Sequence, residues 1–323
     1  MTAVGFDVVV PTVGRPSLAV LLDALGSGRG PAPEQVIVVD DRRHPTPPLP
    51  LGEAGPAGVV VVPGRGRGPA AARNAGWRAG TAEWAAFLDD DVVPPPDWRA
   101  RLAADLAGQP PEVGASQGRL EVPLPAGRRP TDWERNVAGL EAARWATADM
   151  AYRRAALAAV GGFDERFPRA FREDADLAVR VSAAGWRLVV GDRRCVHPVR
   201  PADRWVSVRL QAGNADDVLM RALHGRRWRQ AAGVPPGRRR RHLAVTAAAA
   251  AGLAGALARR PGLASAGLAG WLAGTAELAW ARIALGPRTA SEVATMVVTS
   301  AAIPPAAEVT TMVATSEAVR GPR

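Results

Sequence analysis

The chain contains no lysine, and all 41 of its basic residues are arginine. With 31 acidic residues the formal net charge is +10, a value that by itself suggests a polyanionic partner. The chain is also rich in alanine, glycine and proline, and arginine without lysine is typical of GC-rich coding. The basic excess is therefore weak evidence for nucleic-acid binding, and we expect no nucleic-acid partner.

Cysteine is almost absent, because Cys195 is the only one among 323 residues. A single thiol cannot form an intramolecular disulfide, which excludes a disulfide scaffold and favours a reducing compartment. The first ten residues lack the basic start of a signal peptide, so we expect the catalytic part to stay in the cytoplasm. Hydrophobic residues make up 47% of the chain. This share is enough to bury a core and excludes a wholly disordered protein.

The apolar C-terminal stretches fall short of the roughly 20 residues that span a bilayer. Residues 243–258 and 261–276 are uncharged over 16 positions each, with Arg259–Arg260 between them and Arg238–Arg241 before them. We interpret them as a helical hairpin that lies in or dips into the membrane interface, with the arginines against anionic headgroups. A soluble helical subdomain packed on the catalytic core or on a second subunit is the alternative. Residues 289–323 are expected to form a short helix and then a loose tail.

The first two hundred residues alternate short β-branched runs with longer amphipathic stretches. This pattern predicts an α/β fold with a mixed, mainly parallel sheet flanked by helices. The expected strands are 6–10, 36–39, 59–62 and 84–88, and the expected helices are 17–25 and 69–79. Beyond these residues the composition changes, which predicts a catalytic domain over 1–205 and a helical, basic and apolar membrane-associating region over 206–323.

Polar residues follow three of the predicted strands: Pro11–Thr12, Asp40–Asp41 and Asp89–Asp91. In open α/β sheets ligands bind beyond the carboxyl ends of the strands. Three consecutive carboxylates raise each other's pKa, and a divalent cation relieves this repulsion. Side chains alternate between the two sides of a strand, so Asp89 and Asp91 share one side. Their hard oxygen ligands suit Mg²⁺ or Mn²⁺, and such a cation favours a diphosphate as its remaining ligand. The alternative is a solvated loop whose carboxylates cap the next helix.

Six short motifs in this order resemble the family 2 glycosyltransferases of the GT-A fold, over about residues 5–200. The motifs are Val8–Thr12, Val38–Asp41, Ala72–Gly76, Phe87–Asp91, Gly161–Glu165 and Arg172–Leu177. The C-terminal stretches make the chain similar to an actinobacterial type with membrane-associating helices. The resemblance implies an inverting transferase that uses a nucleotide-diphosphate sugar donor, a hydroxyl acceptor and a divalent cation, Mn²⁺ or Mg²⁺.

The resemblance also implies roles for residues around the donor nucleotide. Pro11 and Thr12 line the base and ribose pocket, and Asp40 or Asp41 accepts a hydrogen bond from the base. Arg73 lies beside the nucleotide.

Further roles are implied for the metal site. Asp89 approaches the ribose or the metal, and Asp91 coordinates the metal that bridges the diphosphate. His197 stands where some relatives have a histidine that completes the metal or diphosphate site, although a structural histidine is an equal alternative.

The family's acidic pair falls on Glu173 and Asp174, with Asp174 as the general base. Attack of a hydroxyl on an anomeric carbon needs a carboxylate within about 3 Å to accept the proton. The pair could instead cap a helix over 175–184, and both roles can coexist. Asp149 is expected near the acceptor end of the cleft.

These features together predict transfer of a single sugar, since the Gln-x-x-Arg-Trp signature of processive relatives is absent. The basic and apolar tail suggests a lipid-linked or cell-envelope acceptor, with a polyprenyl-linked one as an option, and a peripheral or monotopic location at the inner face of the cell membrane. Two alternatives remain: a sugar nucleotidyltransferase, and a catalytically silent membrane-associated scaffold of the same fold.

Overall fold

The computed structural model describes residues 4–52 and 58–320, with side chains as far as residue 316. The chain divides into two compact units. The first comprises Met1–Pro123, Ala138–Val199 and Ala231–Gly233, and the second comprises Leu124–Val137, Arg200–Gln230 and Val234–Arg323. The domain boundary after residue 205 stays a prediction.

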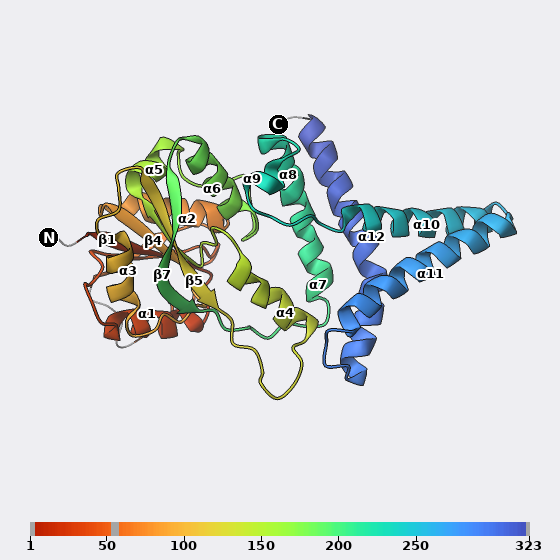
Figure 1. Cartoon of the computed structure of the whole chain (residues 1–323), viewed down its shortest axis with the longest axis horizontal. Helices are drawn as coiled ribbons and strands as arrows, with labels where there is room; N and C mark the ends of the chain where they lie inside the picture. Colours follow the sequence, from red (N-terminus) through yellow and green to blue (C-terminus); the bar gives the residue numbers. More distant parts are fainter. Residues whose placement is uncertain (1–3, 53–57, 321–323) are drawn as a thin grey trace. The chain divides into compact units, whose positions relative to one another are not determined.

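A seven-stranded sheet forms the centre of the first unit (Figure 1). Its strands are β1 (Phe6–Thr12), β2 (Val36–Asp40), β3 (Val59–Pro63), β4 (Trp84–Leu88), β5 (Val113–Glu121), β6 (Asp149–Arg153) and β7 (Arg187–Val196). The spatial order is β3-β2-β1-β4-β6-β5-β7. Only β6 is antiparallel to its neighbours, and the other pairs are parallel. The mixed, mainly parallel sheet predicted from the sequence is confirmed.

Helices cover both faces of this sheet, which explains why its central strands carry runs of buried apolar residues, such as Val8–Val10 and Trp84–Leu88, rather than alternating ones. The helical segments of this unit are α1 (Ser17–Ser27), α2 (Pro69–Ala79), α3 (Trp98–Leu106), η1 (Gly139–Ala142), α5 (Arg154–Ala159) and α6 (Glu173–Ala183). On β1, Val8 and Val10 belong to the core formed with α1 and α3, while Val9 belongs to the core formed with α2, α5 and α6.

The topology brings the ends of four strands to one edge of the sheet. Neighbouring β2, β1 and β4 are parallel, and Thr12 pairs with Asp40 in register. Strand β7 is parallel to β5, and β5 and β4 are both antiparallel to β6. Therefore β7 also ends at this edge, directly before His197.

The second unit is helical. Its helical segments are α4 (Asp132–Ala138), α7 (Val206–Arg209), η2 (Leu210–Gly213), α8 (Asn214–His224), α9 (Trp228–Ala231), α10 (Arg239–Leu257), α11 (Pro261–Ile283) and α12 (Ala290–Arg320). Helices α10 and α11 lie side by side as a hairpin (Figure 1). This arrangement confirms that residues 243–258 and 261–276 form a helical hairpin.

The expectation of a short helix and a loose tail over 289–323 is wrong. One helix, α12, extends from Ala290 to Arg320 and includes Pro304–Pro305. Each proline removes a helical hydrogen bond, but α12 packs against α7, α8, α10 and α11, and this packing maintains the helix. Residues 321–323 lie outside the described part.

By length and composition, α12 is the one described helix that could cross a membrane, over Ala290–Ser316. Its most apolar window is 44% buried within the protein, however. A core helix of a soluble protein passes the same test, so α12 by itself is weak evidence for a membrane span.

Candidate active site

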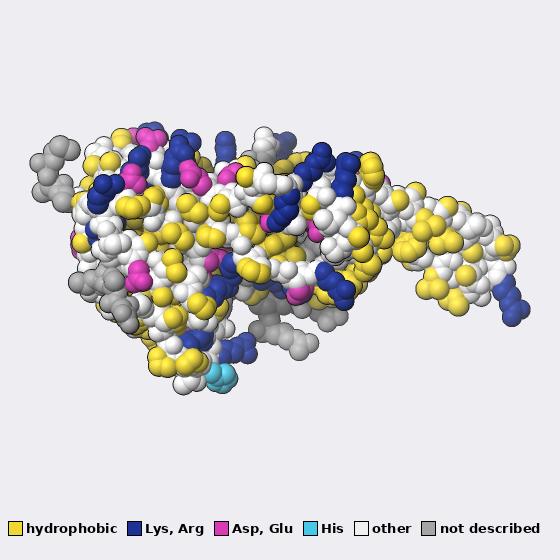
Figure 2. All heavy atoms as spheres, turned by 90° about the horizontal axis from the view of Figure 1, so that it is seen from below, with side chains coloured by type: hydrophobic (Ala, Val, Ile, Leu, Met, Phe, Trp, Pro, Cys, Tyr) yellow, Lys and Arg dark blue, Asp and Glu magenta, His cyan; other side chains and the backbone are white. Residues whose placement is uncertain are grey.

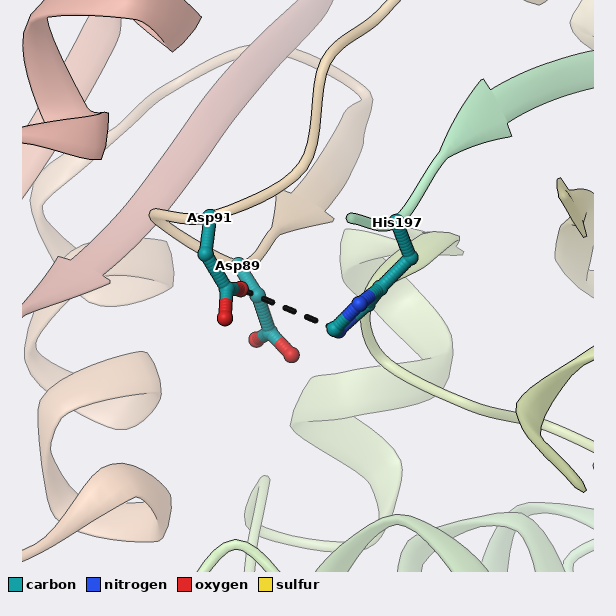
Figure 3. Close-up of side chains that lie close together, drawn as sticks. All are labelled: Asp89, Asp91 and His197. Atoms are coloured by element: carbon teal, nitrogen blue, oxygen red, sulfur yellow. Dashed lines mark ion pairs between the residues drawn. The ribbon is translucent and has the colours of Figure 1, made fainter. Parts of the chain in front are cut away.

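Three potential metal ligands meet at the edge where β4 and β7 end. Asp89 and Asp91 follow β4, and both point toward His197, which follows β7 (Figure 3). The ligand atoms of the three residues lie within 4.8 Å of one another, and His197 Nε2 is 3.8 Å from Asp91 Oδ1. Two carboxylates with one imidazole fit a divalent cation. We call these three residues the metal group.

A short backbone bridge holds the two halves of the metal group together. Val93 donates a hydrogen bond of 2.7 Å to the carbonyl of Val196, and Val196 donates one of 3.1 Å to the carbonyl of Val93. Since Val93 is two residues beyond Asp91 and Val196 directly precedes His197, the bridge fixes both ligands in register.

Arg73 connects the metal group to the acidic pair at the start of α6. It lies on α2, is only 2% exposed, and donates to Asp89 Oδ1 at 2.7 Å and to Glu173 Oε1 at 2.8 Å. A buried guanidinium requires such partners, because an unpaired buried charge is costly. The predicted nucleotide contact Arg73, the predicted metal ligand Asp89 and Glu173 of the predicted acidic pair thus form one network.

The acidic pair lies in the first turn of α6, and the capping position itself is Arg172. Burial, followed by the negative charge of Asp174, raises the pKa of Glu173 to about 8. Burial also raises the pKa of Asp174, although the backbone N–H of Ala175 donates to its carboxylate at 2.7 Å and opposes the shift. The two carboxyls therefore titrate as a pair.

The middle aspartate of the triplet faces a different group of side chains, as alternation predicts. Thr12 donates its hydroxyl hydrogen to Asp90 at 2.6 Å, and Arg15 donates to the same carboxylate at 2.7 Å. Asp90 is thereby buried with a charge partner and ties the end of β1 to the loop after β4. The sequence did not reveal this structural role.

The loops around Asp40 and Asp41 donate hydrogen bonds to both carboxylates. Arg42 forms two side-chain hydrogen bonds to Asp40, of 2.8 and 2.7 Å, and they hold the pKa of this carboxyl below its usual value. The backbone N–H groups of Arg67 and Gly68 donate to Asp41 at 2.9 Å each. Each carboxylate keeps lone pairs for a ligand, so the predicted contact with a base stays a prediction.

Asn74, next to Arg73 on α2, joins two of the sequence motifs. Its side chain accepts a hydrogen bond from Phe163 N–H and donates to the Phe163 carbonyl, both at 2.9 Å. Gly162 has φ of 82°, and a Cβ there would lie 2.4 Å from Asn74 Oδ1. Glycine is therefore required for this close approach.

The expectation that Asp149 serves the acceptor end of the cleft is not supported, because its carboxylate is 1% exposed. Trp98 Nε1 donates to one oxygen at 2.9 Å, and Arg193 Nε donates to the other at 2.7 Å. Arg193 is itself fully buried and also contacts Asp105 at 3.0 Å. Asp149 is thus half of a buried ion pair, which the local sequence could not indicate.

The structure therefore brings together seven of the ten predicted site residues around two connected clusters, and Pro11, Thr12 and Asp40 lie beside them at the ends of β1 and β2. The ion-pair and metal-group contacts join Arg73, Asp89, Asp91, Glu173 and His197. Asp174 follows Glu173, and Asp41 holds the loop that opens α2. Pro11 is partly exposed and pairs with Val39.

Solved structures of low sequence identity resemble the chain in part. S. aureus TarS is 20% identical; the match covers 68% of this chain but only 43% of TarS, with a TM-score of 0.43. Glucosyl-3-phosphoglycerate synthase from Mycobacterium tuberculosis, solved with Mn²⁺, UDP-glucose and phosphoglyceric acid, is 17% identical. That match covers 72% of this chain and 81% of the synthase, with a TM-score of 0.45. These scores are too low to carry an argument about function.

A sequence comparison gives the firmer result. No curated protein matches the chain. Residues 7–160, which contain the strand ends, Arg73 and the metal-group aspartates, match the model of glycosyl transferase family 2. This match assigns the domain over residues 7–160, slightly less than half of the 323 residues, to glycosyl transferase family 2.

Proposed function

We propose that the protein transfers a single sugar from a nucleotide-diphosphate sugar to an acceptor hydroxyl, with inversion at the anomeric carbon. The observation that supports this most directly is the Arg73 bridge, which connects Asp89 of the metal group to Glu173 beside Asp174. A donor diphosphate needs cationic groups and an attacking hydroxyl needs a proton acceptor within one site, and this partly buried network contains both.

In this proposal Asp174 accepts the proton of the acceptor hydroxyl. Asp174 is half-buried, whereas Glu173 is only 2% exposed. When two close carboxyls share one negative charge, the proton remains on the more deeply buried one. Glu173 therefore keeps its proton near neutral pH, and Asp174 is the ionised base.

The metal group would hold Mn²⁺ or Mg²⁺ through Asp89, Asp91 and His197. When bound, such a cation neutralises charge that develops on the leaving diphosphate. Arg73 keeps Asp89 oriented, and the Val93–Val196 bridge keeps Asp91 and His197 in register. The residues of the chain thus supply the orientation and the proton acceptor.

We further propose that the acceptor is lipid-linked or part of a cell-envelope glycan, and that the protein acts at the inner face of the cell membrane. The support comes from the second unit, where exposed leucines of the α10–α11 hairpin lie between two groups of arginines. A polyprenyl-linked sugar is one acceptor of this class.

A thermal-shift screen of the full chain with UDP, GDP and dTDP sugars, with and without Mn²⁺, tests the enzymatic proposal. Asp91→Asn should abolish the Mn²⁺-dependent shift. Asp174→Asn should keep that shift and lower transfer about 10²–10⁴-fold. Asp192→Asn, at a side chain that is 90% exposed, is the matched control and should change neither. Turnover retained in Asp174→Asn would remove it as the base, and no Mn²⁺-dependent shift with any donor would favour the silent scaffold.

A further inference from the structure

The α10–α11 hairpin packs at glycines, which let its two helix backbones approach closely. A Cβ on Gly255 would lie 2.6 Å from the backbone nitrogen of Ala264, and one on Gly267 would lie 2.3 Å from that of Gly252. Side chains larger than hydrogen are therefore excluded at these two positions, while Val245 packs against Gly274 and Leu263 packs against Gly255. The two helix backbones are in direct contact along a strip of small residues.

Four leucines of the hairpin are more than half exposed and lie outside this interface. Leu253 and Leu257 on α10 are 64% and 78% exposed, and Leu268 and Leu272 on α11 are 53% and 51% exposed. In water such a hairpin buries little apolar surface, and the hydrophobic effect would give little reason for the helices to pair. Small residues inside and leucines outside are typical of helices that pair within lipid.

Charged side chains lie at the two ends of the hairpin. Arg238–Arg241 stand at its base, where Arg238 and Arg241 pair with Glu277 of α11 at 3.4 and 2.8 Å. Arg259–Arg260 stand at its tip, and residues 243–258 and 261–276 are uncharged. The 18 positions from Arg241 to Arg259 correspond to about 27 Å of helix, close to the ~30 Å of a hydrocarbon core. Figure 2 shows apolar atoms over the surface of the hairpin and basic atoms at its end.

The distribution of apolar residues also distinguishes between insertion and lying flat. A helix that lies in the interface has a polar face toward water. Residues 243–258 and 261–276 of α10 and α11 are mostly leucine, alanine and glycine, with a few small polar residues and no charged face. Among the described helices only α12 is apolar enough by composition to cross a membrane. The outward direction of the leucines, and not the mean hydropathy of α10 and α11, therefore indicates insertion.

We propose that the α10–α11 hairpin inserts into the acyl-chain region of an anionic bilayer, with its leucines against acyl chains and both arginine groups at headgroup level. This deepens, and rests on, the membrane part of the proposed function. A second copy of the chain fits the surface of the hairpin less well than an anionic bilayer does. Because both ends of the hairpin are basic, parallel and antiparallel pairing alike would bring like charges together, whereas anionic headgroups complement both ends.

A polarity-sensitive fluorophore at the middle of the hairpin tests insertion in the full-length protein. Leu268→Cys is labelled with NBD, and Val61→Cys on β3, where the native valine is 47% exposed, is the control site. Native Cys195 is buried and its thiol pKa is raised by that burial, so it should not label. The vesicles are phosphatidylcholine alone or mixed 3:1 with phosphatidylglycerol, and they carry nitroxides at a shallow or a deep position on the acyl chain.

With phosphatidylglycerol vesicles the Leu268 probe should become several-fold brighter and be quenched more by deep than by shallow nitroxides, while the Val61 probe stays unchanged. Stronger shallow quenching would mean that the hairpin lies on the surface and would overturn insertion. A brighter probe without vesicles, together with a doubled mass in solution, would identify a second copy instead. An unchanged probe with every vesicle would reject the membrane as partner.

Two double variants test the parts of the surface separately by vesicle flotation. Leu253→Glu with Leu268→Glu should weaken binding at least tenfold, because carboxylates would enter the hydrocarbon. Arg259→Gln with Arg260→Gln should weaken binding to anionic vesicles about 25-fold, from roughly fivefold per arginine. Equal flotation of either variant and the wild type would contradict the proposal.

Donor binding separates this inference from the proposed enzymatic function. All four hairpin substitutions should leave the Mn²⁺-dependent thermal shift with a nucleotide sugar unchanged. Flotation without any donor shift would refute the enzyme and leave the hairpin proposal standing. A donor shift without flotation would refute the hairpin proposal alone.

Discussion

Replacing Glu173 by glutamine tests the charge state of the candidate active site. Burial and the charge of Asp174 raise the pKa of Glu173 from 4.5 to about 8, and unfolding returns it to its ordinary value. Between these two pH values the folded state binds more protons than the unfolded state. Stability should therefore fall as pH rises from about 4.5 to about 8, by at most about 1.4 kcal/mol per pH unit for one proton.

Glu173→Gln removes this titration while its amide oxygen still accepts from Arg73. We expect a shallower fall of Tm with pH, and at pH 8 a Tm above that of the wild type by about 2–4 °C for each kcal/mol. Thermal unfolding between pH 5 and 9 measures both. Asp192→Asn is the matched control and should keep the wild-type slope. An unchanged slope in Glu173→Gln would refute the assignment of a shared proton to Glu173.

The same variant separates the two carboxyls in catalysis. Because Glu173 already holds a proton near neutral pH, Glu173→Gln should keep the transfer rate within about tenfold of the wild type at pH 7. Asp174→Asn should lower the transfer rate about 10²–10⁴-fold. Initial rates with one donor and one acceptor suffice for the comparison. Equal losses in both variants would contradict the division of roles.

Three further substitutions test the packing that supports the site. Arg193→Met leaves the Asp149 carboxylate buried without its cation and should cost about 3–5 kcal/mol in urea unfolding. Gly162→Ala should cost more than Gly161→Ala, since both have positive φ but only Gly162 has a neighbour within 4 Å of an added Cβ. The shared backbone strain is about 1–2 kcal/mol, so equal losses of stability would contradict the close contact with Asn74. Arg73→Lys cannot hold Asp89 and Glu173 in the same forked geometry, and we expect a loss of about 1.5–3 kcal/mol by thermal unfolding.

The elements around the strand ends could be predicted because their signals are local. Apolar runs mark β1, β2 and β4, and the aspartates that follow them are adjacent in sequence. Helix α2 matches its expected bounds, Pro69–Ala79, because proline at its first turn and glycine just beyond its end are local signals. The common orientation of Asp89 and Asp91 could be predicted as well, because successive side chains of a strand point to opposite sides.

The remaining features depend on contacts between distant residues. Arg73 and Glu173 are 100 positions apart, and Asp149 and Arg193 are 44 apart. No local pattern distinguishes an aspartate that will meet a buried arginine from one that will face a ligand. Helix α12 likewise continues through Pro304–Pro305 only because other helices pack against it. Long-range packing outweighed the local propensity in each case.

The charges of the candidate site argue that a cation must bind before, or together with, the donor. With Glu173 protonated, the carboxylates of Asp89, Asp91 and Asp174 face the positive charges of Arg73 and, at Asp174, of Arg172, and one negative charge remains in excess. A donor diphosphate is itself negative and would be repelled from such a site. Asp89, Asp91 and His197 would hold one divalent ion, whose charge would remove this excess. Donor affinity should therefore depend steeply on the divalent cation, and much less on monovalent salt at the same ionic strength.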